Sequence, residues 1–167
     1  MSFLLPAVLS CLIVGVVDGD TLTARCDTTS AQQPYQQERV RLTGIDAPER
    51  GQAFARRSRQ AMSDLAYGKQ ARLECGKRDR YQRLVCDVYV SRGASVHGPK
   101  TRDVGLALVE QGLAWWYRAY SHEQTPIQRL RYERAEAHAR GQGLGLWRDP
   151  NPTPPWDHRR RARVRQR

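Results

Sequence analysis

Residues 11–26, CLIVGVVDGDTLTARC, place an apolar, β-branched run and an alternating run on either side of an Asp-Gly dipeptide. Asp-Gly favours a two-residue hairpin turn, because both residues tolerate the backbone conformation that such a turn requires. In the second run, Leu22 and Ala24 fall on one face of a strand while polar side chains occupy the other face. The stretch therefore predicts an antiparallel hairpin with one buried face, built from strands at residues 11–17 and 21–26.

Three further stretches have the pattern of strands. Residues 38–45 alternate, so Val40 and Leu42 are expected to face inward and the side chains between them outward. Residues 70–75 and 84–90 predict two more strands, joined by a charged loop. Together with the first hairpin, the chain has five predicted strands.

Helices interrupt and follow these strands. An amphipathic pattern predicts a helix over residues 52–66. Two later helices are expected, one that Thr101 caps and that ends near Gln111, and one that starts after Thr125 and ends at Gly141. We therefore predict a mainly β fold with helices (α+β), a five-stranded Greek-key barrel of the OB type packed with about three α-helices.

The two ends of the chain differ from its centre in composition. Residues 1–10 are apolar but lack a basic leading segment and an Ala-x-Ala cleavage pattern, so they are either the remainder of a signal peptide or an extension of the first strand. Residues 149–167 begin with four prolines and end with six arginines in the last nine positions. We expect these last nine residues, 159–167, to be disordered and to hold nucleic acid or a membrane surface without specificity. The compact domain is assigned to residues 11–148.

Basic residues dominate the charge of the whole chain. Its 167 residues include 28 Lys and Arg against 17 Asp and Glu, which gives a formal net charge of +11. Such an excess favours a polyanionic partner, first nucleic acid and second an anionic membrane surface. The alternative is a soluble protein whose charge only keeps it dispersed.

The four cysteines flank two predicted hairpins. Cys11 and Cys26 lie on either side of the first, and Cys75 and Cys86 on either side of the second; neither pair has the Cys-x-x-Cys spacing of zinc or redox sites. Residues that face each other across antiparallel strands can form a disulfide, so we predict the pairs Cys11–Cys26 and Cys75–Cys86 and an oxidising compartment. Four buried, reduced thiols are the alternative.

Acidic and basic residues with complementary chemistry lie at predicted strand ends. Clustered carboxylates on turns are the ligands that calcium and magnesium prefer, and a further carboxylate can take a proton from water. Two guanidinium groups can stabilise the charge that builds up on a phosphate during hydrolysis. The residues concerned are Asp18, Asp20, Asp46, Glu49, Arg41 and Arg83.

Six ordered motifs across residues 11–148 resemble the staphylococcal nuclease (thermonuclease) family. They are VVDGDT at residues 16–21, VRL at 40–42, GIDAPE at 44–49, DRYQR at 79–83, EQGLA at 110–114 and LGLW at 144–147. The resemblance implies an OB-fold nuclease with one divalent metal ion, Ca²⁺ or alternatively Mg²⁺. Gln82 departs from the pattern, because the family often has glycine at this position.

The resemblance also implies roles for individual residues. Asp20 and Asp46 match metal-ligand carboxylates, the Ala47 carbonyl a third ligand, and Asp18 an acidic position that tunes the metal site. The catalytic set would be Glu49, which positions or deprotonates water, with Arg41 and Arg83, which grip the phosphate. Tyr120 and Arg80 are assigned to substrate binding.

The function that the resemblance implies is calcium-dependent hydrolysis of DNA and RNA with little sequence specificity, as endo- and exonuclease, leaving 3′-phosphate ends. We expect the protein to prefer single-stranded or frayed substrates and to act as a monomer. We also expect it to have no membrane span and to be secreted or periplasmic, although a cytoplasmic location is the alternative. Two alternatives belong to other classes: a non-catalytic OB-fold module that binds single strands, and a basic protein that binds surfaces through its tail. We expect Trp115, Trp116 and Tyr117 to pack at a helix end more than to stack on bases.

Overall fold

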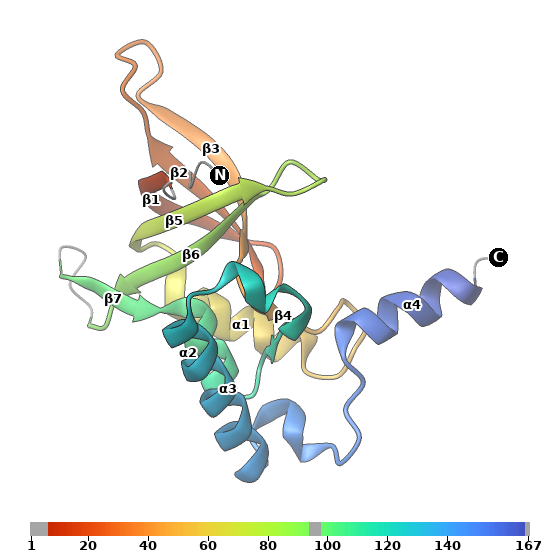
Figure 1. The fold of residues 1–167 in the computed structure, drawn as a ribbon. Helices are drawn as coiled ribbons and strands as arrows, with labels where there is room; N and C mark the ends of the chain where they lie inside the picture. The colour runs from red at the N-terminus through yellow and green to blue at the C-terminus, as the bar shows by residue number, and fades with distance from the viewer. Residues whose placement is uncertain (1–6, 94–97, 166–167) are drawn as a thin grey trace.

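One six-stranded sheet curls into a closed barrel in the computed structural model, which describes residues 7–93 and 98–165. Its strands run in the order β3-β2-β1-β5-β6-β7, and a parallel pairing of β3 with β6 closes a barrel of five strands (Figure 1). The mainly β, OB-type fold predicted from the sequence is thereby confirmed. The strands are β1 (Ala7–Val16), β2 (Thr21–Asp27), β3 (Tyr35–Leu42), β5 (Gln70–Arg78), β6 (Leu84–Ser91) and β7 (Lys100–Asp103).

The β1–β2 hairpin has the predicted inward face, with Ile13, Leu22 and Ala24 all fully buried. Its connection is longer than the predicted two-residue turn. Residues 17–20 form it, and the backbone N–H groups of residues 17 and 18 both donate to the Thr21 carbonyl. Strand β1 already begins at Ala7, and residues 1–6 lie outside the described part of the chain.

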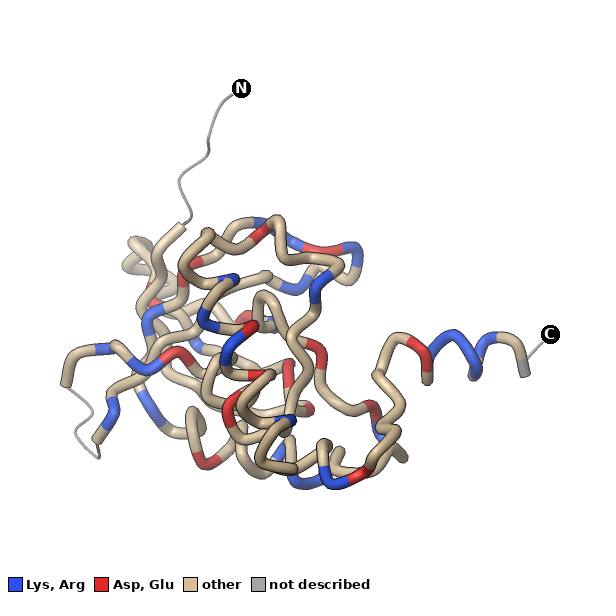
Figure 2. The backbone as a smooth tube through the Cα atoms, turned by 60° about the horizontal axis from the view of Figure 1, so that its bottom comes forward, with Lys and Arg blue, Asp and Glu red and all other residues tan. Residues whose placement is uncertain are grey.

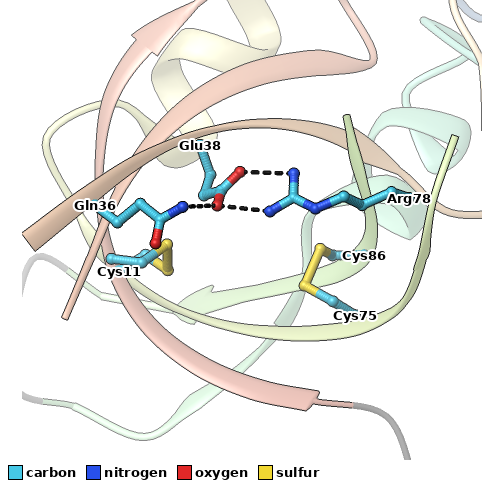
Figure 3. The surroundings of a disulfide bond; sticks show 7 residues. Cys11, Gln36, Glu38, Cys75, Arg78 and Cys86 are labelled. Carbon is cyan, nitrogen blue, oxygen red and sulfur yellow. Dashed lines mark hydrogen bonds and ion pairs between the residues drawn. A yellow bond between two sulfur atoms is a disulfide. The ribbon is translucent and has the colours of Figure 1, made fainter. Parts of the chain in front are cut away.

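Both predicted cysteine pairs are bonded in the structure. Cys11 lies opposite Cys26 in the β1–β2 register, and Cys75 lies opposite Cys86 in the β5–β6 register. Near them, the carboxylate of Glu38 accepts two hydrogen bonds from one guanidinium, at 2.7 and 2.9 Å, and a third from Gln36 at 2.8 Å (Figure 3). Because that guanidinium belongs to Arg78 of β5, the ion pair links β3 to a strand with which it does not pair directly.

Helices α1, α2 and α3 pack around one end of the barrel (Figure 1). Helix α2 is almost wholly buried, and the hydroxyl of Tyr132 on α3 donates to the carboxylate of Asp103 at 2.9 Å, directly before α2. A capping box of Thr125 and Gln128 starts α3 where the sequence predicted. The remaining elements are α1 (Ala55–Ala66), β4 (Ile45–Asp46), α2 (Val104–Glu110), β8 (Trp115–Trp116), α3 (Pro126–Gly141) and two 3₁₀ segments, η1 (Arg118–Glu123) and η2 (Gly145–Arg148).

Three predicted element boundaries are wrong: α1 begins at Ala55 and not at residue 52, and two other differences arise from strand pairing. Thr101 lies in β7 and caps no helix; Asp103 caps α2 instead, by accepting from the N–H of Leu106 at 3.0 Å. Strand β3 ends at Leu42, and a turn separates it from β4. Pairing with neighbouring strands therefore set these last two boundaries, against the local preference of the sequence.

The arginine-rich tail is helical, contrary to the predicted disorder. Helix α4 (Pro155–Arg165) is the fourth α-helix in the described part of the chain, where about three were expected. Its first turn docks through Trp156, whose ring stacks on Tyr117 at 5.2 Å and meets Trp115 edge-on at 5.7 Å. Beyond that turn, α4 projects away from the domain (Figures 1 and 2), and the side chains of Arg160, Arg161 and Arg163 are exposed.

Within the described residues, none of the helices combines the length and apolar composition needed to cross a bilayer.

Candidate active site

A cleft of about 770 Å³ opens beside the barrel, between the β5–β6 connection and the first turns of α4. All nine residues to which the sequence assigned a metal, catalytic or substrate role line this cleft, although they come from distant parts of the chain. They are Asp18, Asp20, Arg41, Asp46, Ala47, Glu49, Arg80, Arg83 and Tyr120.

The β1–β2 connection supplies the first carboxylate. Asp20 is buried, and its Oδ2 accepts from the backbone N–H of Ala47 at 2.9 Å while its Oδ1 accepts from the Thr21 hydroxyl at 2.9 Å. Asp18 turns back to accept from the N–H of Asp20 at 3.0 Å. Gly19 lets this connection approach α1, since a Cβ here would lie 1.9 Å from the hydroxyl oxygen of Ser58. The close fit holds Asp20 against the segment that carries the second carboxylate.

Asp46, on β4, is that second carboxylate, and only 1% of its side chain is exposed. Arg41 donates through Nη2 to Asp46 Oδ1 at 3.2 Å and to the Ile45 carbonyl at 3.2 Å, and the same atom lies 3.8 Å from Asp20 Oδ2. One guanidinium therefore bridges the two acidic groups that were expected to hold a metal.

The carboxylates of Asp18, Asp20 and Asp46 form an acidic cluster, and the pKa values of two of them are raised. Burial raises the pKa of Asp46 to about 6; the charge of Asp20 adds to this effect, and hydrogen bonds from Arg159 oppose it. Burial, and then the charge of Asp20, raise the pKa of Asp18 to about 6 as well. A nearby cation stabilises the ionised form of a carboxylate whose pKa is raised in this way.

The donor set suits a hard cation. Asp20 and Asp46 offer carboxylate oxygens, which calcium and magnesium prefer. Among the described residues, no three His, Cys, Asp or Glu side chains gather into a metal-binding group. A cation at this point would therefore complete its shell with backbone oxygens, such as the Ala47 carbonyl, and with water.

Two arginines face the cleft as donors. Nε of Arg41 is buried and has no hydrogen-bond partner in the described part of the chain, which leaves it available to an anion. Arg83 donates through Nη1 to the Thr21 hydroxyl at 3.2 Å and through Nε to Asp79 at 2.8 Å. Gln82, beside it, has a φ of 62°, the left-handed backbone that favours glycine.

Glu49 is the more accessible carboxylate, with 39% of its side chain exposed. Its Oε1 accepts from Nη1 of Arg159 on α4 at 2.5 Å. Arg159 also reaches both carboxylate oxygens of Asp46, at 3.2 and 2.7 Å. The sequence placed Arg159 only in a non-specific tail, although Trp156, three residues earlier, was a signal that this segment docks.

Aromatic rings complete the cleft. Trp115 and Trp116 are buried, as expected for packing residues, whereas the rings of Tyr117 and Tyr120 lie 4.9 Å apart and line the cleft. Arg80 also lines it, with its guanidinium 4.8 Å from the centre of the Tyr81 ring. These groups offer flat and cationic surfaces beside the acidic cluster.

Comparison with known proteins identifies relatives of most of the chain. Residues 39–149 match the family described as staphylococcal nuclease homologue. A Haemophilus influenzae protein named an uncharacterized endonuclease is 39% identical and covers 93% of this chain and 75% of its own length. Protein ParB of Escherichia coli is 38% identical, covering 92% and 81%, and a micrococcal nuclease of Shigella flexneri is 37% identical, covering 90% and 80%.

Proposed function

The chain belongs to the staphylococcal nuclease family, and from this premise we propose that it is a calcium-dependent nuclease that hydrolyses DNA and RNA with little sequence specificity. Relatives that are named nucleases and endonucleases support a nuclease function and nucleic acid as the substrate class. We propose both endo- and exonuclease action that leaves 3′-phosphate ends.

One observation carries this proposal. Two buried carboxylates, a partly buried guanidinium whose Nε has no partner among the described residues, and a more accessible carboxylate line the same cleft; they belong to Asp20, Asp46, Arg41 and Glu49. Metal-dependent hydrolysis of a phosphodiester uses a cation site, a base and donors for the phosphate oxygens, and a candidate for each is present.

Asp20, Asp46 and the Ala47 carbonyl would hold the metal, and Asp18 would tune the charge around it. A bound Ca²⁺, or alternatively Mg²⁺, supplies Lewis-acid stabilisation of the charge on a phosphate oxygen. Both ions accept such oxygen ligands, so the donor set supports either.

The chain's own groups would perform the remaining chemistry. Glu49 takes a proton from water as the water oxygen forms a bond to phosphorus. The bond from phosphorus to the 5′ oxygen breaks, that oxygen takes a proton from solvent water and leaves as a hydroxyl, and the phosphate stays on the 3′ side. Arg41 and Arg83 stabilise the extra negative charge on phosphorus during this step.

Binding of the strand would use the surroundings of the acidic cluster. Tyr120 offers a ring to a base and Arg80 a charge to a phosphate. The cleft is open, which favours single-stranded or frayed substrates. The arginines of α4 would add affinity that falls as salt rises.

The two disulfides are consistent with an oxidising compartment, and we propose a secreted or periplasmic location on that basis. We propose that the protein acts as a monomer, because one chain supplies every group named above.

Hydrolysis of heat-denatured DNA by the purified protein tests the proposal, with calcium, with magnesium and with chelator. Glu49→Gln should lower turnover by orders of magnitude in calcium, whereas Glu133→Gln, on the exposed face of α3, should not. Cleavage that resists both chelator and Glu49→Gln would contradict the proposal. Tight strand binding without cleavage in any metal would favour the non-catalytic binding module.

A further inference from the structure

Helix α4 places a guanidinium directly on the acidic cluster. Arg159 donates to Asp46 Oδ2 at 2.7 Å, to Asp46 Oδ1 at 3.2 Å and to Glu49 Oε1 at 2.5 Å. Its side chain is 33% exposed, while that of Asp46 is 1% exposed. A tail residue thus contacts both the carboxylate assigned to the metal and the carboxylate assigned to the attacking water.

These contacts occupy the positions that a cation would need. A carboxylate offers about four lone-pair sites. Asp46 uses three of them, because Oδ1 accepts from both Arg41 and Arg159 and Oδ2 accepts from Arg159. A divalent ion bound to Asp46 would also lie within a few ångströms of two guanidinium charges, which repel it.

The attachment of α4 allows this guanidinium to leave. Apart from the ion pairs of Arg159 itself, the first turn of the helix holds it to the domain, because Trp156 stacks on Tyr117 and meets Trp115 edge-on. In the segment before the helix, Gln52 donates to the Thr153 carbonyl at 3.0 Å. An arginine side chain has several rotatable bonds, so it can swing out while Trp156 stays docked.

We propose that Arg159 is a tethered cation that competes with the divalent metal for Asp46 and Glu49, so that metal binding requires its displacement. This inference rests on the proposed function, because it takes Asp20 and Asp46 as the metal site. Arg159 thereby sets how much metal the enzyme needs: the intact chain binds it more weakly than the carboxylates alone would.

Titration calorimetry with Ca²⁺ tests this directly, without any nuclease assay. The full-length protein is compared with Arg159→Ala and with Arg161→Ala, which removes the same charge from an exposed position of α4. A further variant, Asp46→Asn, should lose calcium binding. We expect Arg159→Ala to bind calcium at least about tenfold more tightly than Arg161→Ala, because only the first change frees the carboxylates.

Each outcome is informative. Equal calcium affinity in Arg159→Ala and Arg161→Ala, with binding still abolished by Asp46→Asn, would overturn the competition and leave the proposed function standing. Calcium binding that is absent from all variants, or that is unaffected by Asp46→Asn, would overturn the metal site and the competition together. Arg159→Lys, which keeps the charge but cannot bridge two carboxylates through a planar fork, should have an intermediate affinity. Far-UV circular dichroism of each variant checks that α4 and the barrel remain folded.

Discussion

The guanidinium of Arg83 donates through Nε to Oδ2 of Asp79, four residues earlier in the same β5–β6 connection, at 2.8 Å. The other oxygen of Asp79 accepts the backbone N–H groups of Tyr81 at 2.8 Å and of Arg83 at 3.0 Å. Burial opposes the charge on Asp79, but these bonds outweigh it and hold its pKa below the ordinary value. One carboxylate therefore folds the connection and aims Arg83 into the cleft.

We expect Asp79→Asn to lower kcat by about tenfold, because an amide still accepts the backbone bonds but orients Arg83 less well. Arg83→Ala should cost more, roughly 10²–10³ in kcat. A double variant that is no slower than Arg83→Ala alone would show that Asp79 acts through Arg83. Additive losses in steady-state kinetics would instead give Asp79 a separate role.

Arg41→Ala should lower kcat by roughly 10²–10³ while the barrel stays folded, because the lost donor faces the charge that builds up on the phosphate. Arg39→Ala is the matched control, since Arg39 lies two residues earlier on β3 with an exposed side chain. Near-normal turnover in Arg41→Ala, measured with saturating calcium, would remove Arg41 from the proposed mechanism.

Reduction of the disulfides should weaken the barrel without touching the cleft. The bridges close segments of 15 and 11 residues, and constraint of the unfolded chain gives about 3 kcal/mol for each loop of this length. Urea denaturation with and without dithiothreitol measures the loss in the free energy of unfolding. An unchanged midpoint would mean that the purified protein does not contain the bridges.

Local patterns and motifs account for most of what could be predicted. Alternation marks Leu22 and Val40 as buried because a half-buried strand has a period of two, and the capping box marks the start of α3 for an equally local reason. The candidate site came from ordered motifs that resemble a family, and its residues meet because they lie at ends of neighbouring strands.

The predictions that are wrong concern residues whose structure depends on tertiary contacts. Thr101 resembles a helix cap, yet pairing of β7 with β6 holds it in a strand. Arg159 lies 113 residues from its partner Asp46, and only docking of Trp156 brings the two together. A highly charged run predicts disorder when only its own composition is considered. The sequence does not show that one arginine of this run pairs with carboxylates of the cleft.

Asp87, on β6, links stability to pH away from the cleft. Burial raises its pKa to about 6, although a hydrogen bond from Gln128 at 2.9 Å opposes this shift. The folded state therefore holds this proton more tightly than the unfolded state, and the contribution of Asp87 to stability falls as pH rises from about 4 to about 6. Above that window the buried charge costs at most about 3 kcal/mol, which is the shift converted at about 1.4 kcal/mol per pKa unit.

Asp87→Asn should consequently raise the free energy of unfolding at pH 8 by up to about 3 kcal/mol and leave it nearly unchanged below pH 4. The asparagine carbonyl can still accept from Gln128, so the gain reflects the removed charge and not a lost hydrogen bond. Urea denaturation of both proteins at the two pH values measures the difference. Asp64→Asn, at an exposed position of α1, should show no such dependence on pH. If Asp87→Asn instead destabilised the protein equally at both pH values, Asp87 would act through its hydrogen bonds and not through the cost of its charge.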